Sequence, residues 1–198
     1  MRIRIPRVHI GPGAAIATAV LLAACSTSAP RDDRAAPAAA APAAVSTASE
    51  ATVNLASASA SLVSGKLTLM PMGDGVHIMG TIGGLAPGSI HGFHVHETGD
   101  CSAVDASSAG GHFNPTGSAH GRAGSTPHHA GDIDNIVAGD DGVAQVNVHL
   151  MGVTLGGGAA NDIAGKAFIV HAAPDDYASQ PAGNAGARVA CGVIQVAQ

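Results

Sequence analysis

The amino-acid sequence predicts an all-β domain, and three features of the 198-residue chain support that prediction. From about residue 51 onward, short apolar alternations are separated by turn signals, a spacing typical of a sandwich or barrel. The chain has no Trp, one Tyr and three Phe, so its core must be built from Val, Ile and Leu, which suit strands. No helix of any length is indicated, and no internal repeat is visible.

The first 24 residues have the layout of a secretory signal peptide. Three arginines precede an apolar run from about Ala14 to Ala24, which is well short of the ~20 apolar residues needed to cross a bilayer. The run ends in Leu22-Ala23-Ala24-Cys25-Ser26, which resembles a bacterial lipoprotein cleavage box. That resemblance implies a lipid on Cys25, a membrane anchor, and a location in the periplasm or at the outer membrane. Ordinary cleavage, with Cys25 lost or left free, is the alternative.

Residues 25–50 are rich in Ala and Pro and cannot bury a core, so we expect a disordered tether before a domain at 51–198. Removing the signal leaves six basic residues against fourteen acidic ones, a balance near −8 that disfavours nucleic acid or anionic lipid as a partner. Without Cys25, an even pair of cysteines remains in an exported chain. A disulfide between Cys101 and Cys191 is therefore the default, and zinc binding by them is less expected because neither lies in a CxxC.

The candidate strands are bounded by turn residues and cover 52–56, 65–70, 76–83, 90–97, 143–149, 166–171 and 188–196. Val143, Val146 and Val148 do not alternate perfectly, which leaves open a bulge or a shifted register. A loop over about 98–131 is rich in Gly, Ser and His. A loop of this length indicates a functional segment, which metal ligands would order.

The histidines on and after the strand at 90–97 indicate metal binding. Side chains two residues apart on a strand point to the same face, so His94 and His96 present two imidazoles side by side. Further candidate ligands follow at His112, His120, His129, Asp132 and His171. These are too many for one tetrahedral zinc, but they suit two adjacent ions that share one ligand. The imidazole-rich half favours copper, and the half with a carboxylate favours zinc.

Over about residues 52–198 the sequence resembles the copper/zinc superoxide dismutases. The segments that carry the resemblance, in matching order and spacing, are Gly92-Phe93-His94-Val95-His96-Glu97, Gly110-Gly111-His112-Phe113-Asn114-Pro115, His120-Gly121, His129-Ala130-Gly131-Asp132, Val170-His171-Ala172 and Gly186-Ala187-Arg188-Val189-Ala190-Cys191-Gly192-Val193-Ile194. The resemblance implies an eight-stranded antiparallel Greek-key barrel, flattened like a sandwich, with long metal-binding loops.

The resemblance also implies residue roles. Copper would be held by His94, His96, His112 and His171, and structural zinc by His112, His120, His129 and Asp132, one ion of each per subunit. Copper would alternate between its two oxidation states, turning superoxide into oxygen and hydrogen peroxide. His112 would bridge the ions and, when copper is reduced, leave it and take a proton. Arg188 would dock the anion, held in place by the disulfide. Asp175 would hydrogen-bond His94 and His120, with Asp176 as its rival.

Some residues keep two interpretations. His91, His128 and His149 are interpreted as ordinary histidines without a functional role, with competition against His129 for zinc as the alternative for His128. The group Met70, Met72, His77 and Met79 either captures copper or consists of ordinary strand residues. The loop from His171 to Arg188 has no lysine and carries Gln180 where bacterial relatives often place a positive charge, so Arg122 is the candidate substitute for attracting the anion. A copper or zinc store or chaperone is the rival function, and both a monomer and a homodimer are open.

Overall fold

The computed structural model describes residues 44–197. The predicted signal peptide, the lipidation site at Cys25 and most of the predicted tether lie outside these residues. Among the residues described, the only helical element is a three-residue 3-10 turn, η1, at Ser107–Ala109. Within the same range there is no helix of a length and apolarity that would span a bilayer.

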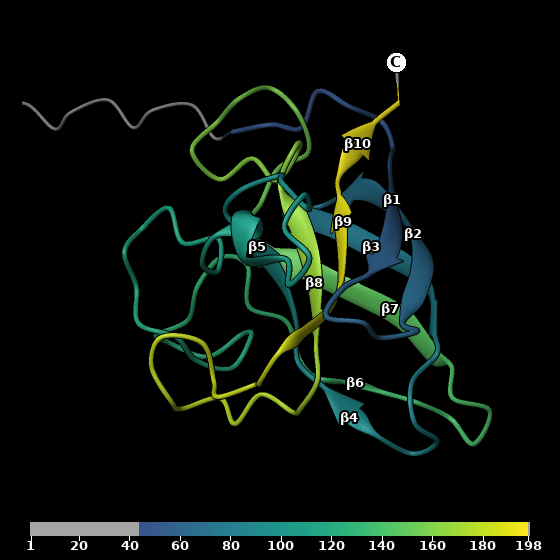
Figure 1. The fold of residues 1–198 in the computed structure, drawn as a ribbon. Coiled ribbons are helices and arrows are strands. Elements are labelled where there is room, and N and C mark those ends of the chain that lie inside the picture. The colour runs from purple at the N-terminus through teal and green to yellow at the C-terminus, as the bar shows by residue number, and fades with distance from the viewer. Residues whose placement is uncertain (1–43, 198) are drawn as a thin grey trace, which may run out of the picture. The chain divides into compact units, whose positions relative to one another are not determined.

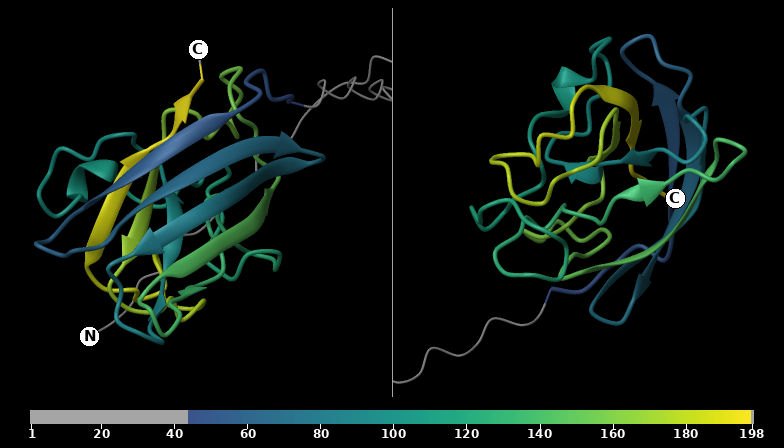
Figure 2. Two further views of the ribbon diagram at one scale, coloured as in Figure 1. Left: turned by 90° about the vertical axis from the view of Figure 1, so that its right-hand side faces the viewer. Right: turned by 90° about the horizontal axis from the view of Figure 1, so that it is seen from below.

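Ten strands make up the domain between residues 44 and 197 (Figure 1). Their bounds are β1 Ala51–Ser57, β2 Ser64–Met72, β3 Gly75–Gly83, β4 Ile90–His91, β5 Phe93–His96, β6 Ile136–Val137, β7 Ala144–Met151, β8 Ala167–His171, β9 Arg188–Val193 and β10 Gln195–Val196. One eight-stranded antiparallel sheet runs in the order β5-β8-β9-β1-β2-β3-β7, with β10 paired to β1. Strands β4 and β6 form a separate ribbon. The sheet curls strongly (Figure 2), so the prediction of an all-β, eight-stranded antiparallel fold is confirmed.

The concave side of the sheet holds an aliphatic core. Alternate residues of β2 and β3 point inward, and Leu67, Leu69 and Ile78 are completely buried. Phe93 of β5 stacks on Phe168 of β8 with ring centroids 4.9 Å apart. This contact fixes β5, the strand that carries His94 and His96, against β8.

The predicted strand at 90–97 is two strands, because the chain breaks pairing at Gly92. The Gly92 N–H donates to the Ala173 carbonyl, and its own carbonyl accepts from the His171 N–H, each at 2.9 Å. A Cβ at this position would lie 2.9 Å from the Cβ of Ala185, so only glycine permits the approach. The prediction at 188–196 is likewise interrupted at Ile194, and the two-residue β6 was missed altogether.

Two smaller expectations are also revised. Strand β7 pairs with β3 in continuous register, so it has no bulge; the irregularity lies instead between Val170 and His171. The predicted tether extends to residue 50, yet the N–H groups of Thr47 and Ala48 donate to the Leu155 carbonyl at 3.1 and 3.0 Å. Packing onto the domain therefore begins a few residues before β1.

Candidate metal centre

Strand β5 lies between β8 and the long loop that follows it. One edge of β5 pairs with β8. On the other edge, the Val95 N–H donates to Gly131 at 2.9 Å, and the Val95 carbonyl accepts from the Phe113 N–H at 2.8 Å. The loop thus returns twice to the same strand, which sets His112 opposite His96 and Asp132 opposite His94.

Four buried imidazoles converge beside β5. Each offers one ring nitrogen, and these nitrogens lie within 4.8 Å of one another; the residues are His94, His96, His112 and His171. In three of them the far nitrogen bonds an acceptor: His94 Nε2 to Asp175 at 2.8 Å, His96 Nδ1 to the Gly110 carbonyl at 3.0 Å, and His171 Nδ1 to the Gly186 carbonyl at 3.3 Å. Carboxylate and carbonyl oxygens only accept, so those nitrogens carry the ring protons and the opposite nitrogens are lone pairs.

The inward nitrogens of this four-histidine set have no partner within the described protein. His94 Nδ1 and the Nε2 atoms of His96, His112 and His171 are all buried and make no hydrogen bond. Buried ring nitrogens are costly to leave unpartnered. Four nitrogen lone pairs directed at one point are the donor set that copper prefers, so the residues fit a copper ion.

A second set surrounds the carboxylate of Asp132. The Nδ1 atoms of His112, His120 and His129 lie 2.8, 3.1 and 3.3 Å from its oxygens. Ligands about 2.0–2.1 Å from a tetrahedral zinc are separated from one another by roughly 3.3 Å. The Nδ1 atoms of His120 and His129 are buried without a hydrogen-bond partner. Three imidazoles and a carboxylate at this spacing fit zinc.

His112 belongs to both sets, with Nδ1 on the Asp132 side and Nε2 in the four-histidine set. An imidazole has two nitrogens and can join two metals once both protons are lost. His128, the alternative to His129, lies outside the cluster and bonds the Ser125 carbonyl through Nδ1. The structure therefore brings together all seven residues that the sequence proposed as ligands.

Asp175 connects the two sets from outside. Its Oδ2 accepts from His94 Nε2 at 2.8 Å, and its Oδ1 accepts from His120 Nε2 at 3.0 Å. The neighbouring Asp176 is exposed and instead bonds the backbone and hydroxyl of Ser179. Of the two carboxylates considered, Asp175 is the one that orients a ring of each set.

The family model for copper/zinc superoxide dismutase (SODC) matches residues 63–194. The chain belongs to the copper/zinc superoxide dismutase family. Two relatives carry the name superoxide dismutase [Cu-Zn] 2. The protein from Aquifex aeolicus (strain VF5) is 45% identical over 136 residues, which cover 67% of this chain and 80% of that protein. The protein from Mesembryanthemum crystallinum is 45% identical over 139 residues, covering 67% and 86%. Copper and zinc are accordingly the metals of this centre.

Some solved structures similar to this chain are of proteins that are not named superoxide dismutase. A double mutant of a SOD-like protein from Bacillus subtilis is 38% identical with a TM-score of 0.67, covering 73% of this chain and 96% of that one. The clock protein EA4 is 35% identical with a TM-score of 0.68, covering 78% of this chain and 98% of that one. Because such names occur on one fold, the side chains of the site carry the functional argument.

Burial sets the protonation of the centre in this dismutase-family domain. Desolvation lowers the pKa of His94 to about 4, although the hydrogen bond to Asp175 opposes it. Desolvation also lowers the pKa of His171 to about 3 and brings the pKa of His96 well below its usual value. Burial alone would raise the pKa of Asp175, but donors from His94, Tyr177 and His120 outweigh it and lower that pKa to about 2. Neutral imidazoles beside an ionised carboxylate are the forms that bind metal.

Arg188 is held beside the four-histidine set by backbone carbonyls. Its Nη1 donates to Ala106 at 2.7 Å and its Nη2 to Gly110 at 2.6 Å. The Gly110 carbonyl also accepts from His96 Nδ1, and Arg188 is the cross-strand partner of His171. The predicted disulfide between Cys101 and Cys191 is confirmed, with Cα atoms 5.7 Å apart. It ties the loop that holds the guanidinium to strand β9, which carries it.

A cavity of about 550 Å³ opens beside His171. Its lining, which includes Ser179, Gln180 and Asn184, contains no lysine, arginine or carboxylate among the described residues. Arg122, the candidate substitute cation, does not line it. The Arg122 guanidinium pairs with Asp134 through two bonds of 3.0 and 2.9 Å and lies over the Tyr177 ring. The expectation that Arg122 attracts the anion is therefore not supported.

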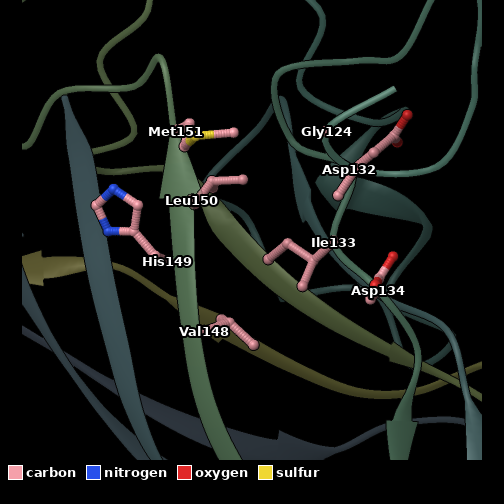
Figure 3. Close-up of a pocket in the computed structure, with 9 residues that line it drawn as sticks. Gly124, Asp132, Ile133, Asp134, Val148, His149, Leu150 and Met151 are labelled. Atoms are coloured by element: carbon pink, nitrogen blue, oxygen red, sulfur yellow. The ribbon is translucent and has the colours of Figure 1, made fainter. Parts of the chain in front are cut away.

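A second hollow, of about 300 Å³, lies between the loop at 123–134 and β7 (Figure 3). Its walls include Ile133, Val148 and Leu150, and Asp132 is the one member of the two ligand sets that borders it.

Sequence reasoning missed two residues that position the site. Gln180 accepts from the His120 N–H at 2.8 Å and donates to its carbonyl at 2.9 Å. Asn135 Oδ1 accepts from the Asp175 N–H at 2.8 Å. No local sequence signal marks either, because each acts across more than thirty residues of chain.

Proposed function

We propose that the four-histidine set holds copper, that the set around Asp132 holds zinc, and that the domain disproportionates superoxide. The observation that carries the proposal is the convergence of four buried, unpartnered ring nitrogens beside a fixed guanidinium. Copper supplies alternating one-electron chemistry: one superoxide is oxidised to oxygen, and a second is reduced and takes two protons to form hydrogen peroxide. The zinc set, closed by four protein ligands, has a structural role.

The chain's own residues supply positioning and a proton site. Arg188 is cationic, and two of its N–H groups donate to backbone carbonyls. The remaining N–H groups of its guanidinium are available to bind a small anion. Nε2 of His112 is the ring nitrogen that can take and release a proton, while Nδ1 stays on the zinc side. The neutral lining of the cavity lets a small anion approach without an opposing carboxylate, although it provides little steering.

Removing the guanidinium tests the proposal. We expect Arg188→Ala to lower superoxide consumption roughly tenfold or more with copper and zinc contents unchanged, since a charge-assisted hydrogen bond is worth about 1.5–3 kcal/mol. Arg188→Lys should recover part of the rate. Arg122→Ala is the matched control, because its guanidinium is committed to Asp134.

Metal removal separates the activity from copper storage. Activity should vanish on chelation and return with copper, whereas zinc alone should restore only stability. A store needs no anion-docking cation, so undiminished turnover in Arg188→Ala would count against docking. Inert copper-loaded protein would contradict the dismutase function.

We further propose that the chain is exported and anchored by a lipid on Cys25, with a tether that runs from Cys25 to about residue 45 and a dismutase domain that begins where Ser46 and Thr47 pack onto Leu155. The box Leu22–Ser26 supports this proposal, and so does the disulfide, because disulfides persist in oxidising compartments. A mass measurement on the membrane fraction tests it. A mature chain that lacks both the residues before Cys25 and a lipid would contradict the anchor.

A further inference from the structure

Methionine and histidine gather on the outer face of β2, β3 and β7. Met70 of β2 lies opposite His77 of β3, and His77 lies opposite His149 of β7. Residues directly opposite on neighbouring antiparallel strands share a face, with Cβ atoms about 5 Å apart. Met72 and Met79 lie two residues along the same strands, so three of the chain's five methionines are on this face.

This face is turned away from the core. The adjacent residues Leu69, Ile78 and Leu150 are buried on the inner side. Figure 3 shows the His149 ring on the opposite side of β7 from Val148 and Leu150. In the left view of Figure 2 the outer face of these strands is towards the viewer.

The two histidine rings of this face are close neighbours. The rings of His77 and His149 have centroids 6.5 Å apart, little more than the 6.2 Å between His112 and His171 in the four-histidine set. Nδ1 of His77 is buried and has no hydrogen-bond partner. Asp74, in the hairpin turn, accepts from His149 Nε2 at 3.0 Å. That bond places the His149 proton on Nε2 and leaves Nδ1 as a lone pair.

We propose that Met70, His77 and His149 form a second copper-binding site, which we call the outer-face site. Its ligands would be the Met70 thioether and one Nδ1 from each histidine. A thioether with two imidazoles is a soft donor set, which selects Cu(I) over zinc. Asp74 orients His149 as carboxylates orient metal-bound histidines elsewhere. The site shares no residue with the metal centre, so it stands whether or not the domain is a dismutase.

The experiment is a copper titration of the holoprotein, already loaded with copper and zinc, with free thiols alkylated. Cu(I) is added anaerobically against the chromophoric chelator bicinchoninate. We expect one additional copper per chain, with a sulfur neighbour in its X-ray absorption spectrum. The additional ion should be lost in His77→Gln and in Met70→Leu, a substitution that keeps the side-chain volume. His128→Ala, which removes an imidazole from another surface, is the control and should keep it.

Three results would overturn the proposal: no additional copper, an additional copper that His77→Gln and Met70→Leu both retain, or displacement by an equal concentration of Zn²⁺. Circular dichroism and unchanged metal content at the main centre show that each variant is folded, so a loss of the additional ion reports on the outer-face site itself.

Discussion

Replacing Asp175 by Asn tests the link between the two metal sets. The carboxylate has three donors: Tyr177 N–H and His120 Nε2 on Oδ1, and His94 Nε2 on Oδ2. An asparagine offers only one acceptor oxygen. It should sit at the Oδ1 position, where it satisfies two donors, and its NH₂ then faces His94 Nε2–H.

That arrangement harms the four-histidine set more than the zinc set. His94 must carry its proton on Nε2 to keep the Nδ1 lone pair for copper, and an N–H facing an NH₂ is a buried, unsatisfied pair. Leaving one buried donor unpartnered costs about 1–3 kcal/mol. Losing a carboxylate behind a metal-bound histidine typically lowers metal affinity by about 10–100-fold. We therefore expect copper affinity to fall by about that factor, and zinc affinity to fall less.

The assay is competition with a chelator, run separately for copper and for zinc, on Asp175→Asn and on the control Asp176→Asn. Asp176 is adjacent in sequence, exposed and bound only to its own loop, so its variant should leave both affinities unchanged. A larger loss of zinc than of copper in Asp175→Asn would refute the reasoning. So would an equal effect of the two substitutions.

Three further predictions concern pH, the disulfide and salt. The free energy of unfolding of the metal-free domain should fall as pH drops from about 6.5 to 4. His94 alone should contribute about 3 kcal/mol to this fall, because folding lowers its pKa from 6.5 to about 4. Urea unfolding at pH 7 and 4.5 measures the difference, and equal stabilities would contradict the prediction. Cys101→Ser with Cys191→Ser opens a link across 90 residues and should cost up to about 4–5 kcal/mol in thermal or urea unfolding, with activity falling as the loop that holds Arg188 loosens. Arg122→Ala should leave the salt dependence of the rate unchanged, because Asp134 already neutralises that cation; a flattened salt profile would show that it steers the anion after all.

Much of the site can be predicted from the two-residue period of a strand and from the order and spacing of the histidine motifs. The alternation at 90–97 is enough to put His94 and His96 on one face, and the register of β5 and β8 then decides which residues join them. That register is a pairing across more than seventy residues, which no local pattern gives. The resemblance of spaced motifs supplied it, which is why His171 was proposed as a ligand despite its distance in sequence.

The misses have local causes. From the sequence alone, Gly92 is an ordinary strand residue, and only the structure shows how closely Ala185 approaches it. Gln180 marks only the loss of a positive charge in the sequence, whereas in the structure its amide bonds both the N–H and the carbonyl of His120. The two-residue strand β6 is too short to leave a period. All three depend on contacts between distant parts of the chain, which local sequence propensity does not report.

One peptide group joins the proposed anion-docking residue to the proposed copper ligands. The Gly110 carbonyl accepts from His96 Nδ1 and from Arg188 Nη2, so the proton position of a ligand ring and the aim of the guanidinium depend on the same oxygen. Gly110 has φ +72°, and a Cβ there would lie 2.7 Å from the Glu97 carboxylate, so the position admits glycine with least strain. A shift of this carbonyl would free His96 to change tautomer and release Arg188 at once. Under the proposed roles, anion docking and metal binding share this backbone carbonyl. A substitution at Gly110 should therefore lower copper affinity and turnover together, unlike Arg188→Ala, which should lower turnover alone.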